Sequence, residues 1–502
     1  MRKRNSRTSA DADITLGRRI IIARRLLAVI WAQRPWALVG FFLGAILEIT
    51  GSLASIYATA KLASLLALFV TQGSTAGIWF WLWADVVAVT SIGLGFLTMN
   101  YAKRMVYFSM VRWSVNTFLS SVSRLDIASF YNTTVRNQLN KISGGYVWQI
   151  PNLTEACLDL MYAVLRFLAI TLVVSQITWW LVPLIALFLV PTLLSESRLA
   201  RMQWFVWDSK GDSRHVFWGL EYIVRQAKGQ MELRTSQASS FVLQKIDRMN
   251  QTFYHEQETK FRQASRLLVP TKILEVAGTA TGSIVLLKQL LARSISLERY
   301  FFLSGALLRI GGALNNIFGT LSRMQESLLF AHSYFQLTDT APRIVDRPDA
   351  QSLQDSTAPS IIFKNVSFTY PDQKNPVFTN LNLELRSGEH VALVGENGAG
   401  KSTIIKLLLR FYRPSSGQIL IDGHDLQDIA IESWYQQLAT LFQDFNQYPL
   451  SIAENIEIGR SDQKPNPELL KNAGKFGSVD ELVKSYEHGW DTVLDSSIKK
   501  GV

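Results

Sequence analysis

The sequence predicts a membrane α-helical bundle that is followed by an α/β domain. Apolar residues make up 48% of the 502 residues, and the long apolar runs lie before about residue 330. After about residue 345 the composition becomes that of an ordinary α/β domain, with a glycine-rich pattern between a strand-like and a helix-like run. The single cysteine, Cys157, excludes an internal disulfide and a cysteine-rich metal cluster.

Six apolar stretches have the length of about 20 residues that a helix needs to cross the hydrocarbon core. They are residues 36–60, 78–99, 157–175, 178–194, 267–291 and 300–323. We therefore expect a domain of six transmembrane helices over residues 36–339, in which the third and fourth helices form a tight hairpin.

Lys and Arg residues are unevenly distributed between the connections. They are dense in residues 1–35, 101–156 and 195–266 and absent from 71–77; only Arg293 and Arg299, between the last two spans, weaken the pattern. By the positive-inside rule we expect a multi-pass membrane protein with both termini cytoplasmic. The net charge of +11 then reflects topology, and nucleic acid is not an expected partner, because the basic residues flank spans.

The N-terminal segment, residues 1–35, has the pattern of a basic amphipathic helix. Arg18-Arg19 and Arg24-Arg25 interrupt its apolar residues, and no small-residue cleavage site follows, so a secretion signal is not expected. Such a helix lies on the cytoplasmic interface and contacts membrane lipids.

The stretches 101–156 and 195–266 are polar and helix-forming, and they are too long for structureless loops. We expect the membrane helices to continue into the cytoplasm and to turn there through a short helix. The candidates for these short helices are residues 129–132 and 219–223. The alternative is a pair of solvated helical hairpins without a partner.

A phosphate-binding pattern, G-x-x-x-x-G-K-[ST], is the most specific motif of the chain. Its residues are Gly395, Glu396, Asn397, Gly398, Ala399, Gly400, Lys401, Ser402 and Thr403. A strand is expected over 391–394 and a helix over 404–409, so that glycine N–H groups and a helix N-terminus meet the phosphates. Lys401 supplies a positive charge and Ser402 a hydroxyl for Mg²⁺, which predicts a nucleoside triphosphate site.

Around this motif the sequence predicts an α/β domain of the P-loop NTPase type over residues 360–502. A linker over 340–359, rich in Pro and Asp, precedes it. Strands are expected over 361–370, 381–385, 417–421 and 438–443.

From about Leu16 onward the chain resembles an ATP-binding cassette (ABC) exporter of the half-transporter kind. The resemblance implies that Tyr370 stacks on the adenine of ATP, and that Gln443 joins Ser402 in binding Mg²⁺. It implies that residues 451–456 open a helical subdomain and that the two cytoplasmic turns are coupling helices. The alternatives are that Tyr370 is a core residue at a strand end and that Gln443 is an ordinary polar loop residue.

The resemblance also implies a dimer with a second half-transporter, either identical or different, in a bacterial plasma membrane. The function implied is ATP-driven efflux of a substrate by alternating access. An importer subunit is disfavoured, because importers usually keep the membrane and nucleotide domains on separate chains.

The sequence departs from this family after Gln443. It contains no Leu-Ser-Gly-Gly-Gln signature, no strand ending in Asp-Glu and no switch histidine, since His488 stands too early. We therefore expect an incomplete nucleotide domain, with no catalytic residue within the chain, that binds ATP weakly without hydrolysis. An incomplete gene model or fragment, a natural pseudo-subunit that pairs with a complete partner, and a chain cut on purpose all explain the departure.

The spans hold charges that are expensive in a membrane and usually face a cavity or each other. They are Arg166, Lys272, Glu275, Lys288 and Arg309. Lys272 and Glu275 can pair on one helix face, and Arg166 and Lys288 can extend to an interface. A basic cavity would suit anionic amphiphiles such as lipids, and equally peptides or drugs, so the substrate stays open, with Arg309 as its best candidate contact.

Overall fold

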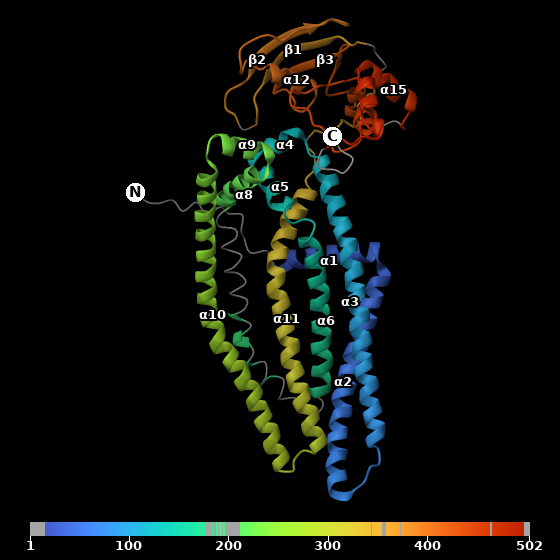
Figure 1. Cartoon of the computed structure of the whole chain (residues 1–502), viewed down its shortest axis with the longest axis vertical. Helices are drawn as coiled ribbons and strands as arrows, with labels where there is room; N and C mark the ends of the chain where they lie inside the picture. Colours follow the sequence, from blue (N-terminus) through green and yellow to red (C-terminus); the bar gives the residue numbers. More distant parts are fainter. Residues whose placement is uncertain are drawn as a thin grey trace, which may run out of the picture. The chain divides into compact units, whose positions relative to one another are not determined.

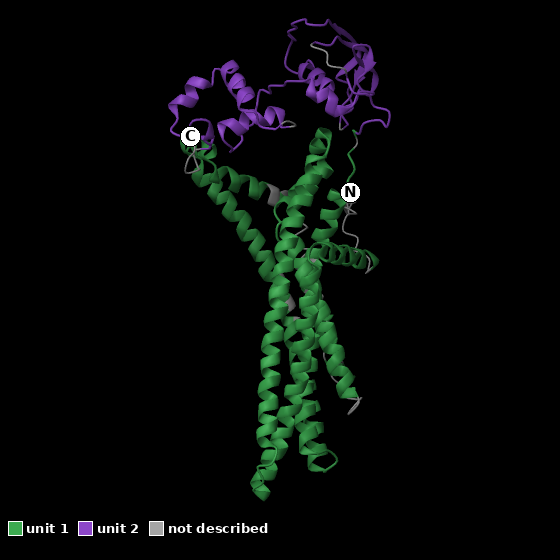
Figure 2. Cartoon of the chain, turned by 90° about the vertical axis from the view of Figure 1, so that its right-hand side faces the viewer, with its two compact units in different colours: residues 1–344 green, residues 345–502 purple. Residues whose placement is uncertain are grey.

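A computed structural model describes residues 16–175, 183, 187–188, 190–192, 194–195, 211–342, 344–353, 358–371, 373–461 and 464–495. The chain divides into two compact units, Met1–Ile344 and Val345–Val502, which Figure 2 colours separately. The division falls inside the predicted linker 340–359.

Unit 1 is helical (Figure 1). Its helices are α1 (Leu16–Gln33), α2 (Pro35–Gln72), α3 (Ile78–Ser123), α4 (Ile127–Tyr131), α5 (Thr133–Ser143), α6 (Gln149–Ser175), α8 (Gly211–Arg225), α9 (Ala227–Thr235), α10 (Ser239–Leu291) and α11 (Leu297–Thr338). Five of the described helices, α2, α3, α6, α10 and α11, have the length and hydropathy to cross a membrane. They contain five of the six predicted spans, which confirms the helical membrane bundle; the predicted span 178–194 lies largely outside the described residues.

The longest helices continue well beyond a bilayer core. At 46 and 53 residues, α3 and α10 are about 69 and 80 Å long at 1.5 Å per residue, against a hydrocarbon core of about 30 Å. The prediction that membrane helices run on into the polar stretches is therefore confirmed for these two helices.

The close contact between α2 and α3 depends on glycine. A Cβ atom on Gly95 would lie 2.5 Å from Glu48 N and 2.6 Å from Gly44 O, and one on Gly44 would lie 2.7 Å from Met99 N. The two backbones approach at these points because no side chain separates them, as is usual for small residues in membrane helix pairs.

The N-terminal helix α1 packs one face on the bundle. Ile22, Leu26 and Ile30, at helical spacing, are buried in the core of unit 1. Arg25 donates to both carboxylate oxygens of Asp339 at 2.7 and 2.8 Å, and these bonds raise the pKa of the Arg25 guanidinium. The amphipathic character expected for this segment is thus visible in its buried face.

Short helices lie beside the ends of the two longest helices, with α4 after α3 and α9 before α10. The first, α4, lies where residues 129–132 predicted it. The second prediction, residues 219–223, is wrong, because these residues lie inside α8 and the short helix is α9. The turn comes later, at Gln226, whose backbone is extended; Gly229 then packs directly on the Ile223 carbonyl, where a Cβ atom would clash.

Unit 2 holds a four-stranded antiparallel sheet in the order β2-β1-β3-β4. The strands are β1 (Ile361–Phe368), β2 (Phe378–Leu385), β3 (Ser416–Ile421) and β4 (His424–Asp425). The helices are α12 (Lys401–Leu408), α13 (Ile431–Gln436), α14 (Ile452–Glu457), α15 (Pro467–Phe476) and α16 (Asp480–Ser485), with 3₁₀ turns at Ile458–Arg460 and Gly489–Asp491. The sheet carries three of the predicted strands, and α12 begins inside the phosphate-binding motif, at Lys401, and contains most of the helix predicted over 404–409.

Two predicted strands are wrong. Residues 391–394 and 438–443 form no strand, and Val394 is 92% exposed. A strand needs a neighbour to pair with its backbone, and the described strands pair only among themselves.

Candidate functional site

The phosphate-binding motif forms a loop whose backbone requires glycine. Gly398 and Gly400 have φ of +88° and +93°, in the left-handed region that other residues avoid. Gly400 is the residue before α12, and a Cβ atom on it would clash with the Phe378 ring and lie 3.0 Å from Val377. The loop therefore turns tightly into a helix N-terminus, an arrangement that favours an anion.

Lys401 places its charge on this loop. Its Nζ donates to the carbonyl oxygens of Gly395 and Glu396 at 2.6 and 2.8 Å. The next two residues differ in burial, with Ser402 exposed and Thr403 buried. The ammonium group and the Ser402 hydroxyl thus lie at the loop, and the residues fit the phosphates and the Mg²⁺ of a nucleotide.

Tyr370 lies beside the same loop. Its hydroxyl is 3.0 Å from Thr403 Oγ1, so residues 33 positions apart meet. Phe368 and Tyr412 contact its ring edge-on at centroid distances of 4.9 and 5.2 Å, and Lys406 Nζ is 5.6 Å from its centroid. The structure brings Tyr370 to the motif, and its stacking on adenine stays a prediction.

Gln443 lies in a segment without regular secondary structure, where its side chain is exposed. Among the described residues, no group of three or more His, Cys, Asp or Glu side chains could hold a metal ion. A Mg²⁺ site formed by Ser402 and Gln443 therefore stays a prediction that depends on the nucleotide for further ligands.

The stretch 451–456 begins a helical part, as the resemblance implied. Ser451 caps α14 through a capping box with Glu454, whose carboxylate accepts from the Ser451 N–H at 2.9 Å. The bonds from the Ser451 backbone and side chain lower the pKa of Glu454. Helices α15 and α16 follow.

A second cluster of chemical interest lies inside the spanning part of unit 1. The Tyr162 hydroxyl donates to Glu48 Oε2 at 2.6 Å, and Arg166 NH1 donates to that hydroxyl at 3.2 Å. Arg166 also lies 3.9 Å from Glu48 Oε1, and the Glu48 side chain is only 8% exposed. An ion pair and a shared hydroxyl thus join α2 to α6.

Arg309 connects α11 to the same face of α2. Its NH1 donates to the Ser52 carbonyl at 2.6 Å and to the Ser52 hydroxyl. One helical turn along α2, Ser55 donates to Asp85 of α3 at 2.7 Å. We call Glu48, Ser52, Ser55, Asp85, Tyr162, Arg166 and Arg309 the intramembrane polar cluster.

Sequence reasoning found the two arginines of this cluster and missed its two acids. Glu48 and Asp85 each lie within a predicted span, so the reasoning that found Arg309 could have found them. The two acids lie near the arginines because of how four helices, α2, α3, α6 and α11, pack together. The spacing of residues in the sequence does not predict this packing.

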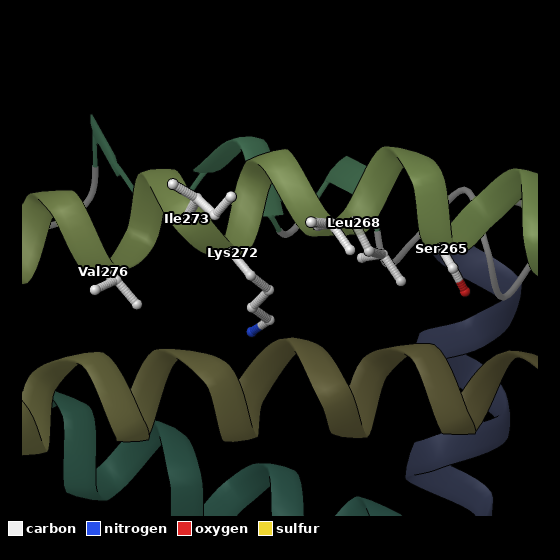
Figure 3. Close-up of a pocket in the computed structure, with 6 residues that line it drawn as sticks. Ser265, Leu268, Lys272, Ile273 and Val276 are labelled. Carbon is white, nitrogen blue, oxygen red and sulfur yellow. The ribbon is translucent and has the colours of Figure 1, made fainter.

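The other three charges that the sequence analysis named within or near spans, Lys272, Glu275 and Lys288, all lie on α10. Lys272 donates to Glu275 at 2.9 Å, which confirms the predicted pair, and Asn315 of α11 donates to Glu275 at 2.6 Å. Lys288 is exposed in the last turn of α10. A surface hollow of about 490 Å³ runs along α10 and is mostly apolar, with Lys272 extending from α10 toward α11 (Figure 3). Its lining residues are Ser265, Leu268, Val269, Lys272, Ile273 and Val276.

Comparison with known sequences gives one family and several relatives. Residues 378–494 match the family model described as ABC transporter. The subtilin transport ATP-binding protein SpaT of Bacillus subtilis is 24% identical over 381 residues, which are 74% of this chain and 60% of the relative. The ATP-dependent lipid A-core flippase of Escherichia coli K12 is 31% identical over 189 residues, 38% of this chain and 31% of the relative. The chain thus matches less than two thirds of the length of these curated relatives.

A solved structure matches over most of the chain. It is that of a bacterial Atm1-family ABC exporter with ATP bound, with a TM-score of 0.76, 19% identity, and coverage of 94% of this chain and 81% of that one. This likeness shows the fold, in which a helical membrane domain is joined to a nucleotide-binding domain.

Proposed function

Because the chain belongs to the ABC transporter family and has the fold of an exporter half-transporter, we propose that it acts as one half of a dimeric exporter. In this proposal, ATP drives the efflux of a substrate by alternating access between inward- and outward-open states. The observation that carries it is the phosphate-binding loop, in which Gly400 directly precedes α12 and Lys401 Nζ lies against the loop carbonyls. The same chain has, in its other unit, helices that are long and apolar enough to span a membrane.

In this proposal ATP and Mg²⁺ are held by residues that the sequence already indicated. The amides of Gly395–Thr403 and the N-terminus of α12 bind the phosphates, and Lys401 neutralises their charge. Tyr370 supports the base, while Ser402 and Gln443 bind Mg²⁺, which would neutralise phosphate charge.

The 502 residues by themselves hold ATP but do not hydrolyse it, we infer, since they contain neither the acidic strand end nor the switch histidine of the family. The second candidate function rests on this same sequence observation. In it the chain is a hydrolysis-deficient subunit or regulator that pairs with a complete ABC partner.

The substrate that we propose is an amphiphile with an anionic group. Arg309 supports this choice, because it is an arginine within a spanning helix whose hydrogen bonds among the described residues go to Ser52 and not to a carboxylate. We place the protein in a bacterial plasma membrane with both termini cytoplasmic, following the distribution of Lys and Arg.

Nucleotide binding by the full chain in lipid nanodiscs tests the proposal. We expect Lys401→Ala to weaken binding of a fluorescent ATP analogue at least tenfold, and the exposed Lys471→Ala of α15 to leave it unchanged. Equal binding by all three proteins would contradict the proposed site. Mg²⁺-dependent ATP turnover by these 502 residues alone would contradict the inference on hydrolysis.

The substrate proposal has its own test. Binding of a fluorescent phosphatidylglycerol to the detergent-solubilised chain should weaken in Arg309→Gln and be retained in Lys288→Gln. Phosphatidylcholine with the same label should bind all three proteins equally. Unchanged phosphatidylglycerol binding in Arg309→Gln would remove Arg309 as a substrate contact.

A further inference from the structure

Lys406 lies on α12 beyond the end of the phosphate-binding motif, and neither the motif nor the resemblance to exporters gives it a role. It stands three residues after Thr403, and residues three apart lie on the same face of a helix. Lys401, at the start of the helix, instead donates its Nζ protons to the carbonyl oxygens of Gly395 and Glu396. The two lysines of α12 therefore serve different parts of the site.

The ring of Tyr370 lies along the face of α12 that Thr403 and Lys406 share. Its hydroxyl is 3.0 Å from Thr403 Oγ1, and Lys406 Nζ lies over the ring at 5.6 Å from the centroid. A cation within about 6 Å of a ring centroid is attracted by the negative face of the ring. The two contacts are one helical turn apart on α12, so together they determine how the ring lies on the helix.

Further contacts of the Tyr370 ring come from the core of unit 2. Phe368 and Tyr412, which are 2% and 6% exposed, lie at interplanar angles of 77° and 87° to it. Such edge-to-face neighbours hold a ring in place and are not stacked on it. Tyr370 itself stays partly exposed. Because Lys406 lies over one face of the ring, a base would stack on the opposite face.

We propose that Lys406 is a positioning residue for the nucleobase, whose ammonium group holds the Tyr370 ring on α12 with the opposite face turned toward the base. The proposal rests on the proposed ATP-binding function and deepens it, because it adds a cation to the aromatic platform. The base and the phosphates are then both positioned by α12, since the N-terminus of the same helix binds the phosphates. Lys406 acts on the base through Tyr370, whereas Lys401 acts on the phosphates.

Binding of ATP and of inorganic tripolyphosphate to the full chain in nanodiscs tests this role. Lys406→Met keeps a long unbranched side chain and removes the charge. It should weaken ATP binding about two- to fivefold, as expected for one cation–π contact, and leave tripolyphosphate binding unchanged. Lys406→Arg keeps a cation and should bind ATP as the wild type does. The matched control is Lys471→Met of α15, which removes an exposed charge elsewhere in unit 2 and should change neither affinity.

A double-mutant comparison shows whether Lys406 acts through the Tyr370 ring. Tyr370→Ala has no ring, so the addition of Lys406→Met to it should not weaken ATP binding further. Tyr370→Phe keeps the ring, so the same addition should weaken ATP binding by the factor seen in the wild type. Residues that act as a pair lose their effects non-additively in this way.

Unchanged or tighter ATP binding in Lys406→Met would overturn the role of Lys406, and so would an equal loss in Lys406→Arg. An equal loss for ATP and tripolyphosphate would overturn it as well, because Lys406 would then attract any anion. A further loss in Tyr370→Ala would show that Lys406 does not act through the ring. A wild type that does not bind ATP would instead overturn the proposed function. If Tyr370→Ala binds ATP as the wild type does, Tyr370 is not the platform of the base, and the role of Lys406 is overturned with it.

Discussion

The Tyr162 hydroxyl donates to Glu48 Oε2 at 2.6 Å and joins α6 to α2 inside the spanning part of unit 1. Arg166 lies close enough to pair with the same carboxylate. Glu48 is buried, and the hydrogen bond and the ion pair described for its carboxylate both come from α6, which makes the contact a determinant of how these two helices pack.

Replacing Glu48 should therefore destabilise unit 1. In Glu48→Gln the Arg166 guanidinium loses its carboxylate, and we expect a loss of about 1–3 kcal/mol, less than for a fully buried pair because Arg166 is 24% exposed. Thermal unfolding in detergent measures the loss. In Glu48→Gln/Arg166→Gln the loss should be smaller than the sum of the two single losses. Additive losses would show that the two charges do not interact.

The contact between α2 and α3 gives a second prediction. Gly95→Ala places a methyl group 2.5 Å from Glu48 N, so the helices must separate, and we expect a cost of about 1–3 kcal/mol. Gly93→Ala is the matched control on the same helix, because a Cβ atom there meets nothing within 4 Å. It should be neutral or slightly stabilising, since Ala is the better helix former. Equal melting temperatures for the two variants would contradict the close contact.

The parts of the fold that depend on local pattern could be predicted from the sequence. Hydropathy located five spans that the described helices contain, and the glycines of 395–403 located the loop and the start of α12. These features depend on residues that are neighbours in the sequence. The strand expected over 391–394 failed for the opposite reason, because its apolar residues need partner strands from elsewhere to become a strand.

The sites depend on distant residues, and the sequence predicted them only in part. Tyr370 was named through the resemblance, but its bond to Thr403 joins residues 33 positions apart, and no pattern in the sequence predicts it. Asp346 lies in the predicted linker and pairs at 3.1 Å with Arg410, which is 64 positions away and belongs to no motif recognised in the sequence. The second short helix was predicted at the wrong residues. Its turn depends on the close packing of Gly229 on the Ile223 carbonyl, which the periodicity of apolar residues does not predict.

A third prediction concerns pH and His332 of α11. Burial lowers the pKa of His332, and the nearby charges of Arg18 and Lys141 lower it further. Below about pH 6.5 the unfolded chain therefore binds more protons than the folded protein, so stability falls as the pH drops from about 6.5 to the lower folded pKa.

The measurement is the melting temperature at pH 7.5 and pH 5.5. His332→Gln cannot gain the proton and should lose less stability on acidification than the wild type. The exposed His255→Gln of α10 is the control and should follow the wild type. If the melting temperature of His332→Gln falls as much as that of the wild type on acidification, His332 does not contribute to the acid sensitivity.

The fourth prediction separates the two readings of Tyr370. If its ring supports the adenine, Tyr370→Ala should weaken ATP binding by about 1–3 kcal/mol, or about 5- to 150-fold, as for other base–aromatic stacks. Tyr370→Phe keeps the ring and loses only the bond to Thr403, so its ATP affinity should stay within about threefold.

Inorganic tripolyphosphate distinguishes stacking from damage to the loop. It has no base, so a loss of stacking in Tyr370→Ala should weaken ATP binding and leave tripolyphosphate binding unchanged. If the ring instead serves as a core residue between Phe368 and Tyr412, its removal disturbs Thr403 and α12. Both ligands would then bind more weakly in Tyr370→Ala and by the same factor, because phosphate binding depends on the position of α12.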